Sequence, residues 1–382
     1  MVAAFDRPKP SPAGAAHDDG RGVTIAVDAM GGDHGPSEVV PGALDHAMAN
    51  PQDRVILVGD AAIVGGLAGT LPENVEIVHA SQVVGMDDHE PAVAVREKKD
   101  SSIVVATDLV KHGKADAVVT AGHTGAGMAA AVLRLGRLPG VDRPALAVQL
   151  ITDAGTLVLL DIGANPDSSP ENLAQYARMG SIFSQRVLGV ETPRVALLSI
   201  GEEKGKGDLR IQQATELLDQ TDLRFVGNVE GKDLTKHDAD VVVCDAVLGN
   251  VVIKFFEGLS TYIFDLFRTE FSRSLRGRIA YVLMRPGIGR IRHVFDYERV
   301  GGSPLLGVKG TVIITHGRAR RRMIGYAVGV AATMARTRVP ELIAAALRPG
   351  GDGGGPAEPS PTPASLDATA TGLTAPALES AS

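Results

Sequence analysis

The stretch VTIAVDAMGGDHGP, residues 23–36, shows the pattern that decides the fold of this chain. An apolar run ends at Asp28, and a Gly-Gly pair, Asp33, His34 and a Gly-Pro step follow it. A short and nearly continuous apolar run predicts a buried strand of a parallel sheet, because both faces of such a strand are covered. The glycines and the two carboxylates then lie in the turn after the strand.

The same pattern recurs along the chain, and segments with helical spacing separate most of the apolar runs. The predicted strands are TIAVD, RVILVG, VEIV, DAVVTAG, ALAVQLI, TLVLLDIG, RVALLSIG, LRFVG and ADVVVCD. Helices are predicted over 37–50, 101–112, 125–137, 170–188 and 208–218. This alternation predicts an α/β protein whose mainly parallel sheet has helices on both faces. The exception is ALAVQLITDAGTLVLLD, residues 145–161, which predicts a hairpin that turns at Asp153-Ala154-Gly155.

Length and composition set limits on what the chain can be. Its 382 residues are 44% hydrophobic but only 4% aromatic, without Trp, so a large core must consist of aliphatic side chains. The formal net charge of −7 argues against a general nucleic-acid binder, because such proteins present a basic face. The single cysteine, Cys244, excludes an intrachain disulfide and a zinc ribbon, and it suits a reducing cytoplasm.

We expect one α/β catalytic domain over residues 22–345, with a disordered segment on either side. Residues 1–21 and 346–382 are rich in small and polar residues and Pro, a composition that buries too little apolar surface to offset the entropy of ordering. The first residues lack the apolar core of a signal peptide. The chain also has no run of about 18 apolar residues, so we expect no segment that spans a bilayer.

Six of the predicted turns after strands collect glycines and polar side chains. They lie within residues 28–34, 122–127, 161–165, 201–207, 227–231 and 249–254. Ligands of parallel sheets bind at the carboxyl ends of the strands, so we expect these turns to converge on one edge. TAGHTGAG, residues 120–127, has the small residues and the helix start of an anion site, and Lys204 or Lys254 would add positive charge. The alternative is that each is an ordinary strand-to-helix turn.

Common catalytic and nucleotide-binding motifs do not match. GEEKGKG, residues 201–207, lacks the spacing and the hydroxyl residue of a P-loop, and GHTGAG differs from GxGxxG. The absence of HExxH and GxSxG argues against zinc hydrolysis and serine acyl transfer. Cys244 lies in the apolar VVVCD run without an evident His partner, so we interpret it as a core residue and not as a nucleophile. His34, His123 and His316 show no metal-ligand spacing, and we predict no metal site.

Several segments together resemble a known family. They are AVDAMGGDHGP, REKKDSS, TAGHTGA, GRLPGVDRPALA, DIGAN, IGEEKGKG, FVGNVEG, ADVVVCD, GNVVIK and GGSPLLGVKG, in that order between residues 23 and 317. The chain resembles the bacterial phosphate acyltransferases of phospholipid synthesis, the acyl-[acyl-carrier-protein]:phosphate transacylases. Two features depart from that family: His123 stands where Asn is common, and a basic run, residues 318–322, replaces small polar residues after Gly317.

The resemblance implies a fold, a reaction and partners. The fold is a three-layer α/β/α sandwich, similar to phosphotransacetylase and isocitrate-dehydrogenase-like folds, and the protein is a homodimer without a cofactor. Inorganic phosphate takes a long-chain fatty acyl group from an acyl carrier protein, and the acyl phosphate formed supplies a glycerol-3-phosphate acyltransferase. The alternative function is that of a phosphotransacetylase acting on short-chain acyl-CoA.

The expected chemistry assigns roles to the turn residues. Phosphate can attack a thioester directly because a thiolate leaves readily, so the site has to orient phosphate and stabilise the oxyanion. The candidate catalytic residues are Asp28, Asp33, Asn165, Lys204, Asn228, Asn250 and Lys254. The candidate substrate-binding residues are Gly31, Gly32, Gly122, His123, Thr124, Gly125, Asp161, Gly163, Glu203, Gly205 and Glu230. The asparagines would donate hydrogen bonds, and Asp28, Asp33 and Asp161 would orient lysines or accept a proton from phosphate. Capping of the first turn is the alternative for Asp28 and Asp33.

Residues 259–299 form an amphipathic, arginine-rich helical insertion. We predict two helices here, separated near Gly277 and ended by Pro286. The residues of the longer apolar face are Leu259, Tyr262, Ile263, Leu266 and Phe267. Three interpretations remain open: a membrane-surface helix pair, a dock for acidic acyl carrier protein, and a dimer interface. A long-chain product needs a bilayer, which favours a cytoplasmic enzyme held peripherally at the inner face of the cell membrane.

Overall fold

The computed structural model describes residues 20–152, 154–294 and 296–348. The predicted disordered arm 1–21 and tail 346–382 lie almost wholly outside these residues, so their disorder stays a prediction. Arg21 is described, and it contacts the end of a helix near residue 336. Its carbonyl accepts a hydrogen bond from Arg336 Nε at 2.9 Å, and its guanidinium donates to the Ala335 carbonyl at 3.1 Å. The packed part of the chain therefore includes Arg21, one residue earlier than expected.

Within the described residues, eleven strands form one sheet in the order β3-β2-β1-β4-β11-β10-β5-β6-β9-β7-β8. The strands are β1 (Thr24–Asp28), β2 (Arg54–Gly59), β3 (Val75–His79), β4 (Ala117–Thr120), β5 (Ala145–Ile151), β6 (Thr156–Leu160), β7 (Val195–Leu198), β8 (Phe225–Val229), β9 (Val241–Val243), β10 (Ser303–Leu306) and β11 (Thr311–Ile314). The nine predicted strands are confirmed. Sequence reasoning missed β10 and β11, because both are short and β10 contains Pro304.

The direction of the strands changes in the middle of the sheet. Strands β3, β2, β1, β4 and β11 run parallel, and so do β6, β9, β7 and β8. Between these groups, β11 pairs with β10, β10 with β5 and β5 with β6, each time antiparallel. The mainly parallel sheet and the β5–β6 hairpin are thus confirmed, although Asp153 of its turn lies outside the described residues. Three reversals leave the two parallel groups antiparallel to each other.

This reversal corrects one expectation of the sequence. The carboxyl ends of β1 and β4, with the turns that follow them, lie along one edge of the sheet. The carboxyl ends of β6, β7, β8 and β9 lie along the opposite edge, because these strands run in the other direction. The polar turns therefore do not converge on one edge, and residues 249–254 are not a turn but part of the helix α8 (Ala246–Ser272). The predicted β5–β6 hairpin produces this reversal, because the two antiparallel pairings of β10 cancel each other and leave β5 parallel to β11.

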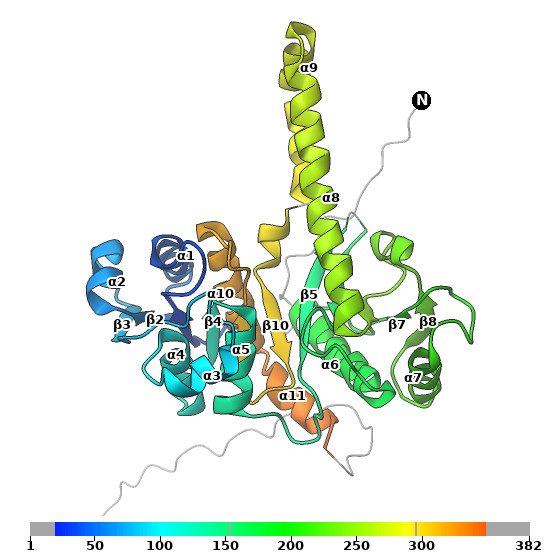
Figure 1. The fold of residues 1–382 in the computed structure, drawn as a ribbon, viewed down its shortest axis with the longest axis horizontal. Helices are drawn as coiled ribbons and strands as arrows, with labels where there is room; N and C mark the ends of the chain where they lie inside the picture. The colour runs from blue at the N-terminus through cyan, green and yellow to red at the C-terminus, as the bar shows by residue number, and fades with distance from the viewer. Residues whose placement is uncertain (1–19, 153, 295, 349–382) are drawn as a thin grey trace, which may run out of the picture. The chain divides into compact units, whose positions relative to one another are not determined.

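Helices cover both faces of the sheet (Figure 1). One face packs against α1 (Pro36–Ala49), α6 (Pro170–Leu188), α10 (Arg321–Arg336) and α11 (Val339–Ala346). The other face packs against α4 (Ser102–Lys111), α5 (Thr124–Ala130) with the π-helical turn Ala131–Leu135, and the start of α8 (Ala246–Ser272). The remaining helices include α2 (Ala61–Ala68), α3 (Pro91–Glu97), α7 (Leu209–Asp219) and α9 (Leu275–Val294). The three-layer α/β/α architecture is confirmed.

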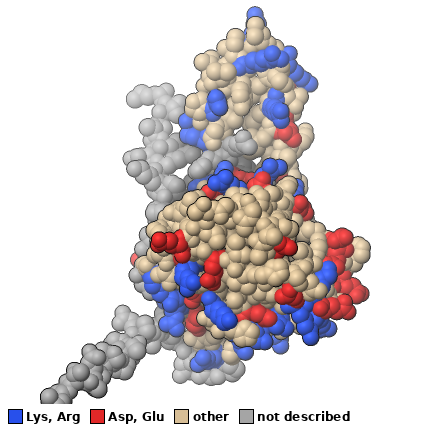
Figure 2. All heavy atoms as spheres, turned by 90° about the vertical axis from the view of Figure 1, so that its left-hand side faces the viewer, with Lys and Arg blue, Asp and Glu red and all other residues tan. Residues whose placement is uncertain are grey.

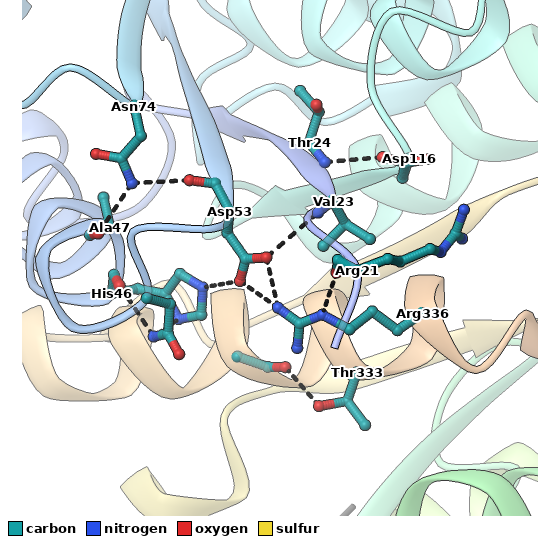
Figure 3. Close-up of polar contacts among 12 residues, drawn as sticks. Arg21, Val23, Thr24, His46, Ala47, Asp53, Asn74, Asp116, Thr333 and Arg336 are labelled. Carbon is teal, nitrogen blue, oxygen red and sulfur yellow. Dashed lines mark hydrogen bonds and ion pairs between the residues drawn. The ribbon is translucent and has the colours of Figure 1, made fainter. Parts of the chain in front are cut away.

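A buried ion pair joins helices α1 and α10 to the amino ends of strands β1 and β2 (Figure 3). Asp53, which is fully buried before β2, is bound by Arg336 of α10, and His46 Nε2 of α1 lies 3.1 Å from its carboxylate. The Val23 amide donates to the same carboxylate at 3.3 Å. One carboxylate thus connects α1, α10, β2 and the residue before β1.

The arginine-rich insertion is longer than predicted and is divided at a different residue. Helix α8 begins at Ala246, and the break to α9 lies at 273–274, before Gly277. The predicted stop at Pro286 is wrong, since α9 continues to Val294. A proline removes one helical hydrogen bond, and on an exposed helix water can bind the carbonyl that is freed. The two helices contact each other through Phe271 and Tyr281, whose ring centroids lie 5.8 Å apart.

Helix α8 also bears on the expectation that no segment spans a bilayer. It is the one helix among the described residues that is long and apolar enough to cross a membrane, by length and composition alone. Core helices of soluble proteins pass the same test, so the finding does not place α8 in a bilayer.

Two glycines of α8 give a matched test of its packing. A Cβ on Gly249 would lie 1.9 Å from the Asp161 carbonyl oxygen, whereas a Cβ on Gly258 would meet nothing within 4 Å. We expect Gly249→Ala to lower the free energy of unfolding by about 3 kcal/mol or more, because a backbone atom cannot rotate away. Gly258→Ala should raise it by up to about 1 kcal/mol through helix propensity. Urea unfolding of both variants measures this, and a Gly249→Ala protein as stable as wild type would contradict the packing.

Candidate functional site

A cavity of about 580 Å³ lies on the face of the sheet that carries α5 and α8. Alternate residues of β5, Leu146, Val148 and Leu150, form an apolar floor, since side chains two apart in a strand share a face. Helix α8 supplies one wall, and Thr124 at the start of α5 lies on the lining as well. The cavity is therefore built over the antiparallel centre of the sheet, between the two parallel groups.

One part of the lining carries a compact polar group. Lys254 Nζ lies 3.1 Å from Glu257 Oε2 on α8, and Glu257 Oε1 lies 2.7 Å from His316 Nε2 in the turn after β11. Burial raises the pKa of Glu257, but hydrogen bonds from His316 and Lys254 and their charges outweigh it and lower the pKa to about 2. Glu257 is therefore ionised at neutral pH and accepts hydrogen bonds from both neighbours.

The turn after β1 packs closely against the turn after β4. Asp28 Oδ2 accepts a hydrogen bond from Thr120 Oγ1 at 2.8 Å, and burial raises the pKa of Asp28 against the opposing hydrogen bonds. A Cβ on Gly31 would lie 2.7 Å from the Gly122 amide nitrogen, so the close approach requires glycine. Asp28 thus holds two turns together. Among the described residues no hydrogen bond joins Asp28 to a lysine, and its predicted catalytic role stays a prediction.

The neighbouring residues Asp33 and His123 are also engaged in local contacts. The Asp33 amide donates to the Gly317 carbonyl at 2.8 Å, which brings this turn beside His316. His123 Nδ1 accepts from the Gly125 amide at 3.0 Å and so caps α5. The capping bond occupies one of the backbone donors that the predicted anion site required. Gly32 packs against Ala121 and Gly317, where a Cβ would lie 3.0 Å from each carbonyl oxygen.

The turn after β6 is shaped by Asp161. Its buried carboxylate accepts from the amides of Leu146, Gly163, Ala164 and Asn165 at 2.8–3.1 Å. Burial raises the pKa of Asp161, and these hydrogen bonds oppose the increase. The Asn165 amide group donates to the Pro144 carbonyl at 2.6 Å and to Asp161 at 3.0 Å, so both of its hydrogens are engaged. Asp161 and Asn165 therefore hold the turn together. Within the described residues, no hydrogen bond joins Asp161 to a lysine, and both amide hydrogens of Asn165 are already used.

The remaining candidate site residues lie beside β7 and β8, the last two strands in the order of the sheet. Lys204 is 80% exposed and pairs with Asp219 at 3.1 Å. Glu230 pairs with Lys232 at 2.8 Å. Neither these residues nor Glu203, Gly205 and Asn228 line the cavity. Strands β7 and β8 are separated from the central strands by β6 and β9, which explains why their turns do not reach it.

The cavity thus collects four of the predicted residues and adds others. Those predicted are Thr124, Gly163, Asn250 and Lys254. Those missed include Thr315, His316 and Glu257. The i, i+3 spacing of Lys254 and Glu257 on one helix was a usable signal. The turn at His316 escaped because β11, the strand before it, was not predicted.

Cys244 and the basic run 318–322 both lie in structural contacts. Burial raises the pKa of the Cys244 thiol, and its sulfur lies 3.5 Å from the Asp161 carbonyl, outside the cavity lining. Arg321 binds Asp45 of α1 at 2.6 Å, and Arg322 binds Asp296. The basic residues therefore tie the start of α10 to its neighbours. Within the described part of the chain, no three His, Cys, Asp or Glu side chains gather as metal ligands.

Comparison with known proteins gives the family. A family model described as fatty acid synthesis protein matches residues 23–342. A phosphate acyltransferase of Desulfitobacterium hafniense is 48% identical over 312 residues, which cover 81% of this chain and 93% of that protein. The chain belongs to the phosphate acyltransferase family. It is therefore an acyltransferase. A phosphate acyltransferase of Brevibacillus brevis is 44% identical over 328 residues, which cover 85% of this chain and 98% of that protein.

Solved structures agree with the predicted fold. The EutD phosphotransacetylase of Staphylococcus aureus matches with a TM-score of 0.54 and 17% identity, over 82% of this chain and 94% of that one. A phosphotransacetylase of Streptococcus pyogenes matches with a TM-score of 0.53 and 18% identity, over 82% and 94%. At such identities the likeness shows the fold alone, and the predicted similarity to phosphotransacetylase folds is confirmed.

Proposed function

We propose that this phosphate acyltransferase transfers a long-chain fatty acyl group from acyl carrier protein to inorganic phosphate. The observation that supports this best is the cavity itself, which joins a long apolar floor to the cationic group at Lys254. The acyl phosphate formed would supply the acylation of glycerol 3-phosphate by a further acyltransferase. No cofactor takes part in the proposed reaction.

The residues of the cavity divide the chemical work. Phosphate binds beside Lys254, whose charge neutralises part of the dianion, and Thr124 and Asn250 supply uncharged donors to phosphate or to the oxyanion. The bound phosphate attacks the thioester carbonyl directly, because the thiolate is a good leaving group. The protein contributes mainly the fixed orientation of the two reactants.

The apolar floor favours a long chain over an acetyl group. Each buried methylene stabilises a complex by about 0.8 kcal/mol, so a long acyl chain gains far more from the β5 floor than acetyl does. We expect the kcat/KM for palmitoyl carrier protein to exceed that for acetyl-CoA by at least about 100-fold. Phosphate-dependent release of thiol measures both reactions. Equal rates would instead favour the phosphotransacetylase function on short-chain acyl-CoA.

We also propose that the outer part of the α8–α9 pair contacts the inner face of the cell membrane. Figure 2 shows Lys and Arg side chains on this pair, and α9 exposes the apolar residues Val282 and Leu283, which lie in the sequence between Arg278 and Arg285. Apolar side chains among arginines suit an anionic lipid surface.

Nearer the sheet, an exposed apolar stripe on α8 supports a homodimer contact; its members include Val247, Val251, Phe255 and Tyr262. The alternative is that the arginines of α8 and α9 bind acyl carrier protein.

Flotation with anionic liposomes tests the membrane contact. We expect the double variant Val282→Glu and Leu283→Glu to lose most of the flotation that the wild-type protein shows, because two charges enter the apolar layer. Ile200→Glu is the matched control, since Ile200 is 82% exposed on a turn after β7. If the double variant floats as well as wild type, this segment is not the membrane contact.

A further inference from the structure

His316 and Glu257 form a hydrogen-bonded pair on the cavity lining. Glu257 belongs to α8 and His316 to the turn after β11, so the 2.7 Å contact joins two elements that both line the cavity. The His316 side chain keeps 32% of its surface exposed, whereas Glu257 is half as accessible, at 16%. The imidazole is thus the more open member of the pair.

The charges around the pair decide which ring nitrogen of His316 carries a hydrogen. An ionised Glu257 can only accept a hydrogen bond, so Nε2 must donate to it. Lys254 Nζ lies 3.4 Å from the same Nε2, but an ammonium can only donate, and it therefore points its hydrogens to Glu257 as well. In the neutral ring the lone pair is then on Nδ1. Nδ1 has no hydrogen-bond partner within the part of the chain that the structure describes.

The proposed reaction has one proton to move. Hydrogen phosphate attacks the carbonyl carbon, a C–O bond forms, and the C–S bond breaks with its electron pair left on sulfur. The P–OH proton is lost from phosphate and the thiolate gains one, so that RCO–SR′ and HPO₄²⁻ become RCO–OPO₃²⁻ and HSR′. The P–OH group becomes more acidic as the carbonyl carbon withdraws electrons, and a neighbouring base of moderate strength can then accept its proton.

We propose that His316 carries this proton and that Glu257 positions His316 for the transfer. Nδ1 accepts the P–OH proton from phosphate bound beside Lys254 and then gives it to the thiolate sulfur. Glu257 keeps the hydrogen on Nε2 and stabilises the imidazolium between the two transfers, as a carboxylate does for a catalytic histidine. The inference rests on the proposed function, and it adds a catalytic residue to it.

Several charged groups surround His316 and would contribute to any pH profile. Lys254 and Glu257 come from α8, and Arg318 lies 3.7 Å from Glu257. Asp33 lies nearby, because its amide donates a hydrogen bond to the Gly317 carbonyl, next to His316. Asp296, also on the cavity lining, is bound by Arg322. Phosphate itself titrates near neutral pH. Chemical rescue by added imidazole is therefore a sharper readout than the pH profile alone.

The test uses two substitutions of His316. Gln places an amide N–H where Nε2 stood, so His316→Gln keeps the donor to Glu257 but removes the base, and His316→Ala leaves space for imidazole. We expect kcat of the Gln variant to fall about 100-fold or more, with the KM for phosphate within about threefold of wild type. Added imidazole should raise the kcat of the Ala variant by at least about tenfold and should leave the kcat of wild type unchanged. His112→Ala, at the exposed end of α4, is the control for loss of a histidine.

The outcomes separate this inference from the proposed function. If wild type releases no carrier-protein thiol with phosphate, the proposed function fails, and the inference with it. If wild type is active and His316→Gln keeps more than about a third of its kcat, the proton carrier is wrong while the function stands. A folded His316→Ala variant that imidazole does not activate also overturns it. Should the Ala variant fail to unfold cooperatively, the Gln variant decides alone.

Discussion

A Lys254→Ala variant will lose about 100-fold or more of its phosphate-dependent acyl transfer, whereas Lys204→Ala will keep the activity of wild type. The sequence offered both lysines as the cation for phosphate, and the structure separates them. Lys254 lines the cavity beside His316, while Lys204 lies at the far edge of the sheet, paired with Asp219. The Lys254 side chain is 50% exposed, but Glu257 and His316 hold it on the cavity lining, so loss of its charge beside phosphate costs several kcal/mol. Removing the 80% exposed Lys204 costs little.

The measurement is thiol release from palmitoyl carrier protein at varied phosphate concentration. The loss for Lys254→Ala should appear in kcat/KM for phosphate, and Lys254→Arg should recover part of it, because the charge is kept. Thermal unfolding of each variant serves as the check on folding. A Lys204→Ala variant as impaired as Lys254→Ala would show that phosphate binds elsewhere.

Asp53→Ala should lower the free energy of unfolding by about 3–5 kcal/mol. Asp53 is fully buried, and its removal leaves Arg336 and His46 buried without their shared partner. A matched control is Glu76→Ala, which removes the surface pair with Arg54 at 3.3 Å and should change the stability by about 1 kcal/mol or less. Urea unfolding of the three proteins at neutral pH measures the difference.

The same carboxylate predicts a dependence on pH. Burial would raise the pKa of Asp53, but hydrogen bonds from His46, Arg336 and the Val23 amide outweigh it, and the pKa is lowered. A lowered folded pKa gives stability that is present above the unfolded value, about 4, and is lost as the pH falls through the folded value. The difference between wild type and Asp53→Ala should therefore be full at pH 7 and shrink below about pH 4. A difference that stays constant down to pH 2 would contradict the ion pair.

Local pattern was enough for most of the fold but not for the site. Runs such as TIAVD and VALL, residues 195–198, are buried on both faces whatever strand lies next to them, so composition predicts them. The site depended on β10, a strand of four residues with a proline, whose pairing could not be read from its own sequence. Lys204 and Lys254 follow the parallel neighbours β7 and β9, but Lys254 lies within α8 and so reaches His316. Because β11 was missed as well, Glu257 and His316 had no predicted role.

What the sequence alone determined is the class of the molecule: an α/β sheet of aliphatic strands, a hairpin at 145–161, and the family to which its segments belong. Those features follow from neighbours in the chain, because burial and turn formation act over a few residues. Only the tertiary structure decided which polar turns share a cavity and which carboxylates hold turns together. Strand order and direction place residues far apart in the chain beside each other, and the three antiparallel pairings at the centre of the sheet bring His316 to Glu257.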